Sequence, residues 1–319
     1  MGRADIDPEI ALFVDRVAAG WAQHPPFETL AIQEARRVAE QIRAPWRADG
    51  PRMADISEHL VPTSTGPLRA RLYNPGVTLP APALIYLHGG GFILFSIDTH
   101  DRLMREYAAA GEFLVLGVDY PLSPEARYPK ALNQIVELVE WLHSGGAETL
   151  GIDPRRLAIG GDSAGGNLSV ATALRLRDAG NPDWLGGLLL NYGAFGVECS
   201  DEAEARFGGP GAVLQRAEMN HYFVSYLGEH GLSEPEAYAA PILADLHRLP
   251  PAFFAIPECD LLAEQSYDMA DRMKKAGVEV TSVVYRGATH SFLEAMSVAQ
   301  VARKAIEDGA DWVRTILSR

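Results

Sequence analysis

The chain has 319 residues, enough for one large α/β domain with an insertion or for two domains at most. Hydrophobic residues make up 47% of it, which favours a substantial core and disfavours long disordered stretches. The net charge of −14, from 28 basic and 42 acidic residues, repels nucleic-acid phosphates and anionic lipids. Neither a nucleic acid nor a membrane is therefore expected as a partner.

The first fifty residues are predicted to be helical. Apolar residues between positions 8 and 19 fall on one stripe of a helix, and residues 27–44 predict a second helix. The helical periodicity then gives way to a strand-like pattern. Residues 56–61 and 68–73 predict two strands of a hairpin that turns at residues 63–67.

Continuous apolar strands alternate with helices in the rest of the chain. Helices are predicted over residues 99–110 and 129–143 and from Ser163 onward. Such alternation is typical of an α/β fold with right-handed crossovers, in which helices cover both faces of a mostly parallel sheet. The strands are predicted over residues 83–87, 113–118, 157–160, 187–190, 252–256 and 278–285.

Residues 195–240 interrupt this alternation. They contain no buried strand but acidic, helix-like sequence with aromatic residues, which predicts an insertion above the sheet that packs with the helices of residues 1–50. Residues 51–194 and 241–319 then form the catalytic domain. Inserted segments at the carboxyl ends of strands commonly build substrate pockets.

The most informative motif is Gly161-Asp-Ser-Ala-Gly165. It follows a predicted strand and opens a helix, which is the setting of a nucleophile elbow. Glycines flank the serine because the sharp turn leaves no room for side chains, and the exposed hydroxyl lies at a helix N-terminus that favours negative charge. The alternative interpretation is an ordinary helix N-cap, but the strand-to-helix setting favours Ser163 as a nucleophile.

A second motif, His88-Gly-Gly-Gly91, directly follows the predicted strand 83–87. Consecutive glycines let backbone N–H groups converge on one point, where a substrate oxyanion can bind. The N–H of Ala164, the residue after the nucleophile, would complete such an oxyanion hole. A mobile glycine loop without this function is the alternative.

A serine hydroxyl needs a base, and the base needs an orienting carboxylate. His290 follows the last predicted strand, at the sheet edge where Ser163 is expected, whereas His88 is expected to brace its own loop. Asp260 follows the strand 252–256. Folds with a nucleophile elbow of this kind place the three residues along the chain in the order Ser, Asp, His. Glu258, two residues earlier, is the rival acid.

Two further carboxylates, Asp162 and Glu125, are expected near the site. For both, we predict hydrogen bonds that brace loops rather than a part in catalysis. The cysteines Cys199 and Cys259 allow at most one disulfide and no Cys-x-x-Cys metal site, and no other metal-ligand cluster is apparent. Residues 1–20 do not resemble a signal peptide, and no window approaches the ~18 uninterrupted apolar residues of a membrane span, so a cytoplasmic location is expected.

From about residue 50 to the end, the chain resembles the hormone-sensitive-lipase-like esterases, also called bacterial family IV carboxylesterases, of the α/β-hydrolase superfamily. The resemblance implies a cofactor-free esterase that acts on short acyl chains, with a helical cap built from residues 1–50 and 195–240. It also implies that Gly90, Gly91 and Ala164 donate to the oxyanion. Five motifs carry it in order: His88-Gly-Gly-Gly-Phe92, Asp119-Tyr120 with Pro124-Glu125, Gly161-Asp-Ser-Ala-Gly-Gly-Asn167, Glu258-Cys-Asp260 and Gly287-Ala-Thr-His-Ser-Phe292.

The chain departs from the family pattern at three positions. The family usually has glycine at the position of Phe95, arginine at that of Pro121 and proline at that of Leu261. The phenylalanine places a large ring near the predicted oxyanion loop, unless it turns into the core. We list six aromatic residues as candidates for the substrate pocket: Trp21, Phe92, Phe95, Tyr192, Phe195 and Tyr222.

Two other functions remain open at this point. A ligand-binding protein on an inactive hydrolase fold, as in plant hormone receptors that lack the histidine, is disfavoured because His290 is present. An amidase or deacetylase would use the same three residues, and the sequence does not separate it from an esterase. The last strand, 278–285, is expected at the sheet edge, where the family often dimerises, so a homodimer is also expected.

Overall fold

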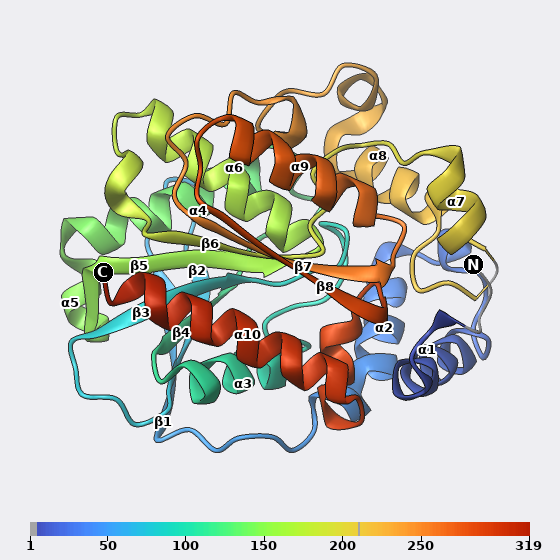
Figure 1. Cartoon of the computed structure of the whole chain (residues 1–319), viewed down its shortest axis with the longest axis horizontal. Coiled ribbons are helices and arrows are strands. Elements are labelled where there is room, and N and C mark those ends of the chain that lie inside the picture. Colours follow the sequence, from blue (N-terminus) through green and yellow to red (C-terminus); the bar gives the residue numbers. More distant parts are fainter. Residues whose placement is uncertain (1–4, 210) are drawn as a thin grey trace.

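The computed structural model describes residues 5–209 and 211–319, and these form an eight-stranded sheet covered by helices on both faces (Figure 1). The strand order is β1-β2-β4-β3-β5-β6-β7-β8. The strands are β1 (Asp55–Val61), β2 (Leu68–Asn74), β3 (Ala81–Leu87), β4 (Leu114–Asp119), β5 (Ile152–Asp162), β6 (Gly187–Asn191), β7 (Ala252–Cys259) and β8 (Val280–Thr289).

The strand pairing confirms the predicted α/β architecture. β1 pairs with β2 and β2 with β4 in antiparallel fashion, and every later pair is parallel. The central strands are buried on both faces, as in β3, which explains why they are continuous apolar runs rather than alternating ones. The predicted hairpin of residues 56–61 and 68–73 is thus confirmed as β1 and β2.

Two helical layers cover the sheet. Figure 1 shows α4, α6 and α9 on one face and α3 and α10 on the other, and each layer packs its own apolar cluster against the strands. The helices are α1 (Pro8–Trp21), α2 (Ile32–Arg47), α3 (Asp101–Gly111), α4 (Lys130–Trp141), α5 (Ala147–Leu150), α6 (Ala164–Asp178), α7 (Asp201–Phe207), α8 (Arg216–Ser233), α9 (Ala263–Lys275) and α10 (Gln300–Leu317). In the part of the chain described above, no helix is both long and apolar enough to cross a bilayer.

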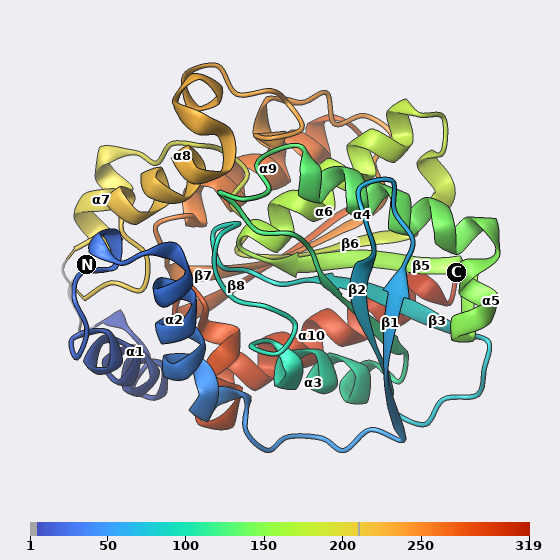
Figure 2. The same ribbon diagram turned by 180° about the vertical axis from the view of Figure 1, so that it is seen from behind.

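The helices α1, α2, α7 and α8 lie beyond the carboxyl ends of the parallel strands (Figures 1 and 2). No strand interrupts residues 195–240 in the described part of the chain, as predicted. These four helices therefore lie where they can form the walls of a site at the strand ends.

Three predicted boundaries were wrong. α2 begins at Ile32 rather than at residue 27, because residues 27–29 form a separate 3₁₀ turn and Ala31 is extended. β5 begins at Ile152 and β8 runs to Thr289, since both lengthen through pairing with neighbouring strands across irregular registers. The longer β8 matters for the site, because it ends directly before His290.

β8 is the edge strand opposite β1, as the sequence predicted. It carries the exposed side chain of Val284, and an unpaired strand edge can join a second chain. The homodimer through residues 278–285 stays a prediction. Light scattering at micromolar concentration should give the mass of a dimer, and the mass of a monomer would contradict it.

Candidate active site

Ser163 lies at the turn between β5 and α6. Its backbone has φ 53° and ψ −115°, a conformation that costs free energy in a residue with a side chain and is held by the surrounding structure. Its N–H donates to the carbonyl of Asn191, and its own carbonyl accepts from the N–H of Ala194. These two hydrogen bonds hold the turn against the end of β6. The hydroxyl points into a cavity at the strand ends.

The glycine at position 165 is required by a close backbone approach. A Cβ there would lie 1.9 Å from the carbonyl oxygen of Leu87, the last residue of β3. The turn therefore brings α6 against the end of β3 at a distance that only glycine allows. This contact places the helix N-terminus beside the loop that follows β3.

The imidazole of His290 bridges Ser163 and Asp260. Its Nε2 lies 3.0 Å from the Ser163 Oγ, and its Nδ1 lies 2.9 Å from an Asp260 carboxylate oxygen. A carboxylate only accepts hydrogen bonds, so Nδ1 carries the proton and Nε2 presents a lone pair to the serine hydroxyl. Such an arrangement can remove the serine proton and stabilise the resulting imidazolium.

The rival acid Glu258 makes a different contact. Its carboxylate accepts the backbone N–H of Gly287 at 3.0 Å, which braces the end of β8. Asp260 is 1% exposed, and its second oxygen accepts the N–H of Leu262. Both Asp260 oxygens are therefore fixed, one of them on the imidazole.

The loop after β3 approaches the same point. Gly90 has φ 109°, and a Cβ there would lie 2.3 Å from the carbonyl oxygen of Leu94, so the tight loop excludes a side chain. Gly90, Gly91 and Ala164 all line the cavity that holds the Ser163 hydroxyl. Their backbones thus stand beside the Ser163 hydroxyl at the start of α6, where the helix dipole favours negative charge.

Buried polar residues brace this loop and the elbow from behind. Asp162 accepts from the Tyr86 hydroxyl at 2.9 Å and lies 3.3 Å from the His100 Nε2. Burial works to raise the pKa of Asp162, but the neighbouring His100 and Tyr86 outweigh it and hold the pKa below its ordinary value. Burial likewise works to lower the pKa of His100, and the Asp162 carboxylate raises it overall. Each side chain therefore favours the charged form of the other beneath the turn at Ser163.

His88 braces its own loop. Its Nδ1 lies 2.7 Å from the Gly89 carbonyl oxygen, and its ring stacks on Tyr120 at 4.3 Å. Burial, followed by the nearby His100, lowers the pKa of His88 to about 4. The ring is thus uncharged at neutral pH and donates from Nδ1.

Glu125 braces loops farther from Ser163. It lies on the surface and binds the guanidinium of Arg36 in α2 through both carboxylate oxygens, at 2.8 and 2.9 Å. The same arginine donates to the carbonyls of Ile93 and Ser123. The glutamate therefore fastens an N-terminal helix to the loops of the sheet and does not touch Ser163 or His290.

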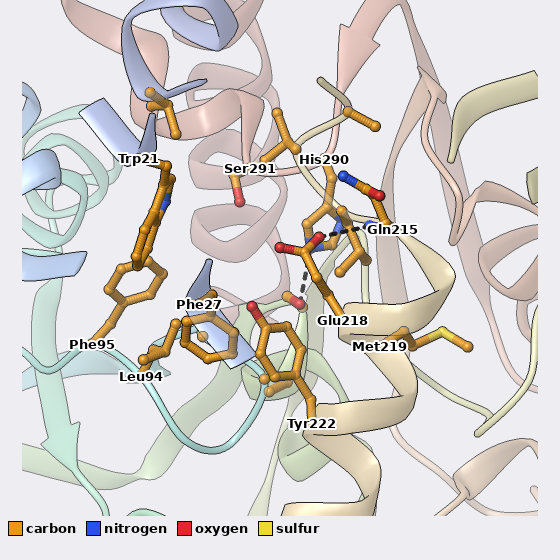
Figure 3. A pocket seen from close by; sticks show the side chains of 18 of the residues that line it. Trp21, Phe27, Leu94, Phe95, Gln215, Glu218, Met219, Tyr222, His290 and Ser291 are labelled. Carbon is orange, nitrogen blue, oxygen red and sulfur yellow. Dashed lines mark hydrogen bonds between the residues drawn. The ribbon is translucent and has the colours of Figure 1, made fainter. Parts of the chain in front are cut away.

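A cavity of about 450 Å³ surrounds the Ser163 hydroxyl. Its walls come from α1, α2, α8 and the loop after β3, and Figure 3 shows Trp21, Phe27, Leu94, Phe95 and Tyr222 gathered on one side of it. A cavity of this size suits a small organic ligand.

Four of the six aromatic pocket candidates line this cavity: Trp21, Phe92, Phe95 and Tyr222. The prediction was wrong for Tyr192 and Phe195, which are fully buried outside it. Tyr192 packs its ring on His290 at 5.1 Å, and Phe195 packs on Phe254 of β7 at 5.9 Å. Both come shortly after β6, and their rings are buried in the core.

Sequence reasoning missed several residues of the site. His100 is one of them, as the partner of Asp162. Arg43 and Glu294 form an ion pair in the cavity wall, and Glu218 of α8 points into the cavity (Figure 3). The one available signal was the charge of Arg43 within an otherwise apolar helix face. In the described part of the chain, no three His, Cys, Asp or Glu side chains are placed to hold a metal ion.

Comparisons with known proteins show the family. A family model described as an alpha/beta hydrolase fold matches residues 84–294. A hyperthermophilic esterase from the archaeon Pyrobaculum calidifontis is 29% identical over 97% of this chain and 98% of that one, with a TM-score of 0.89. A thermostable carboxylesterase cloned from a metagenomic library, EstE1, is 30% identical over 90% and 98%, with a TM-score of 0.86.

A thermostable esterase from Pseudomonas putida ECU1011 is 27% identical, with 99% of each chain covered and a TM-score of 0.91. The family match covers more than half of the chain. The structures of these esterases match nearly its whole length. The protein therefore belongs to the hormone-sensitive-lipase-like carboxylesterases of the α/β-hydrolase family and is a carboxylic ester hydrolase.

Proposed function

We propose that this esterase hydrolyses short-chain acyl esters through an acyl-enzyme formed on Ser163. The observation that carries the proposal is the chain of two contacts from the serine hydroxyl to His290 and from His290 to Asp260, at 3.0 and 2.9 Å. These are hydrogen-bond distances for a nucleophile, a base and an orienting acid.

The reaction takes two steps. The Ser163 oxygen attacks the ester carbonyl carbon while its proton passes to His290 Nε2, and the C–O bond to the alcohol then breaks as His290 returns that proton to the leaving oxygen. A water molecule next gives a proton to His290 and attacks the acyl-enzyme, which releases the carboxylic acid and restores the serine hydroxyl. No cofactor enters this scheme.

The negative charge of each tetrahedral intermediate would be held by the backbone N–H groups of Gly90, Gly91 and Ala164. Support comes from their position on the cavity wall beside the nucleophile and from the helix N-terminus at Ala164. His88, Asp162 and His100 would keep this loop and the elbow in register.

We assign the capping role to the segments 1–50 and 195–240. Trp21 from α1 and Tyr222 from α8 face the cavity, and the Phe27 ring packs edge-on against both at 5.8 and 5.9 Å. Asn167 of α6 donates to the carbonyls of Ala194 and Ala239, which fastens both ends of the insertion to the helix that carries the nucleophile. The small aromatic cavity that results is the basis for proposing short substrates.

The test compares esters and amides of the same acyl group. Purified protein is given 4-nitrophenyl butyrate and butyryl 4-nitroanilide, and kcat/KM is measured for each. We expect the ester to be hydrolysed far faster, with complete and irreversible loss of activity after treatment with a short alkyl phosphonate ester that labels Ser163. Faster hydrolysis of the anilide would favour an amidase, and labelling of another residue would contradict the proposed nucleophile.

Phe95 should limit the size of the substrate. It has φ 69°, in the left-handed region that favours glycine, and its half-buried ring lines the cavity. In Phe95→Gly, we expect kcat/KM for the longest acyl or alkoxy chains to rise about tenfold relative to acetyl esters, because the ring no longer closes one side. The change in preference is measured with two series of esters, one with acyl chains of increasing length and one with alkoxy chains of increasing length. Lower thermal stability with an unchanged preference would instead identify Phe95 as a packing residue.

A further inference from the structure

The inner wall of the cavity holds a buried ion pair that the proposed reaction does not use. Arg43 comes from α2, and Glu294 comes from the 3₁₀ segment Phe292–Ser297, four residues after His290. Both line the same cavity as Ser163, and they are 5% and 6% exposed. Burying two charges beside a substrate cavity is costly unless hydrogen bonds satisfy both of them.

The pairing of Arg43 is incomplete. Its Nη1 lies 3.4 Å from a Glu294 oxygen, and this nitrogen has no hydrogen-bond partner within residues 5–209 and 211–319. The guanidinium otherwise contacts the rings of Phe13 and Phe95, with centroids at 5.1 and 5.3 Å. Ring faces attract the cation but leave an N–H donor without an acceptor, and a buried donor in that state is destabilising.

Phe95 helps to keep the cation in this place. Its ring lies between the guanidinium and the loop of Gly90, where a Cβ on that glycine would come within 2.8 Å of the ring. The rest of this side of the cavity is apolar, with Trp21, Phe27 and Leu94 (Figure 3). A plain alkyl chain that reached this wall would therefore offer the guanidinium no acceptor.

The surrounding charges favour a neutral acceptor over an anion. Glu294 already balances the charge of Arg43, and the His100–Asp162 pair lies behind them. Across the cavity, Glu218 of α8 lines the wall, and one of its carboxylate oxygens accepts the Gln215 N–H at 2.9 Å (Figure 3). A carboxylate on the substrate would meet two carboxylates of the protein, whereas an uncharged oxygen can accept from Arg43 without that repulsion.

We propose that Arg43, held by Glu294 and Phe95, is a specificity-determining residue that selects esters with an uncharged oxygen acceptor on the arm facing it. An ether, hydroxyl or carbonyl oxygen on the acyl or alkoxy chain is the chemistry that fits. The inference rests on the proposed function and names the substrate class of the same site.

The first experiment uses the wild-type protein and matched ester pairs. Linear acyl and alkoxy arms are compared with analogues in which one CH₂ is replaced by an ether oxygen, placed in turn at each chain position. We expect the ratio of kcat/KM for ether over alkyl to peak at one position by about tenfold, because a charge-assisted hydrogen bond forms only where the oxygen meets Arg43. A ratio that only declines as the ether oxygen moves away from the ester carbonyl would show an inductive effect of that oxygen on the carbonyl. That result would overturn the proposal.

The second experiment removes the ion pair as a unit. The double variant Arg43→Met with Glu294→Leu substitutes apolar side chains of similar volume, an exchange that buried ion pairs often tolerate. The peak should disappear, and alkyl arms should be preferred. The matched control, Arg37→Met with Glu34→Leu, removes an exposed pair from the same helix and should keep the peak. A peak that persists in the first variant contradicts the role of Arg43.

The two proposals fail in different ways. A flat ether-to-alkyl ratio with hydrolysis that still depends on Ser163 rejects the subsite alone. Hydrolysis that is unaffected by Ser163→Ala rejects the mechanism. Circular dichroism reports whether the double variant folds, and the wild-type position scan decides the question even when it does not.

Discussion

Replacing Ser163 with alanine is expected to lower kcat for ester hydrolysis by about 10⁶-fold, because the three triad residues act as a unit and the remaining two have no nucleophile to activate. The hydroxyl contacts His290 at 3.0 Å and Ser163 lines the cavity, so its loss should disturb little of the core. The thermal unfolding midpoint should therefore change little. Initial rates on 4-nitrophenyl acetate, with the hydrolysis of buffer alone subtracted, measure the loss.

The control for this prediction is Ser291→Ala. Ser291 follows His290 and also lines the cavity, but its hydroxyl does not hydrogen-bond to Ser163 or Asp260 in the described residues. This variant should retain most of the activity. If Ser163→Ala keeps more than a few per cent of the wild-type rate, the nucleophile has been assigned to the wrong residue.

Asp260→Asn is expected to leave the protein folded and to lower kcat by about 10⁴-fold. One Asp260 oxygen accepts the N–H of Leu262 at 3.0 Å, and the asparagine carbonyl can keep that bond. Its NH₂ group then faces His290 and donates to Nδ1, which moves the imidazole proton to Nε2. A protonated Nε2 cannot accept the proton of the Ser163 hydroxyl.

Glu258→Gln is the matched control, since it makes the same carboxylate-to-amide change two residues away. Glu258 accepts the Gly287 N–H at 3.0 Å, and a glutamine oxygen can do the same. Its effect on kcat should be less than about tenfold. Should Glu258→Gln prove the more damaging of the two, the orienting acid would have to be moved to Glu258.

Much of the fold followed from local pattern. The apolar runs that became β3, β4, β6 and β7 are buried on both faces, so composition alone marked them as central strands. The ends of elements followed less well. α2 starts five residues late, because the Phe27 ring packs against Tyr222, and that contact is not local in sequence.

By itself, the sequence determined the order and local setting of Ser163, Asp260 and His290. Each follows a buried strand, and the carboxyl ends of parallel strands meet at one edge, so chain order was enough to bring the three together. The glycine motifs also located the sharp turn at Ser163 and the tight loop after β3, because close backbone approach excludes other residues there. These inferences depend on backbone geometry, which short motifs specify.

Only the tertiary structure decided what surrounds the triad. It directed Tyr192 and Phe195 into the core and Phe95 toward the cavity, although all three are aromatic residues in loops after strands. It also joined Arg43 to Glu294, 251 positions apart in the sequence. Side-chain direction and long-range ion pairs depend on how helices pack above the sheet, and neither periodicity nor motif spacing carries that information.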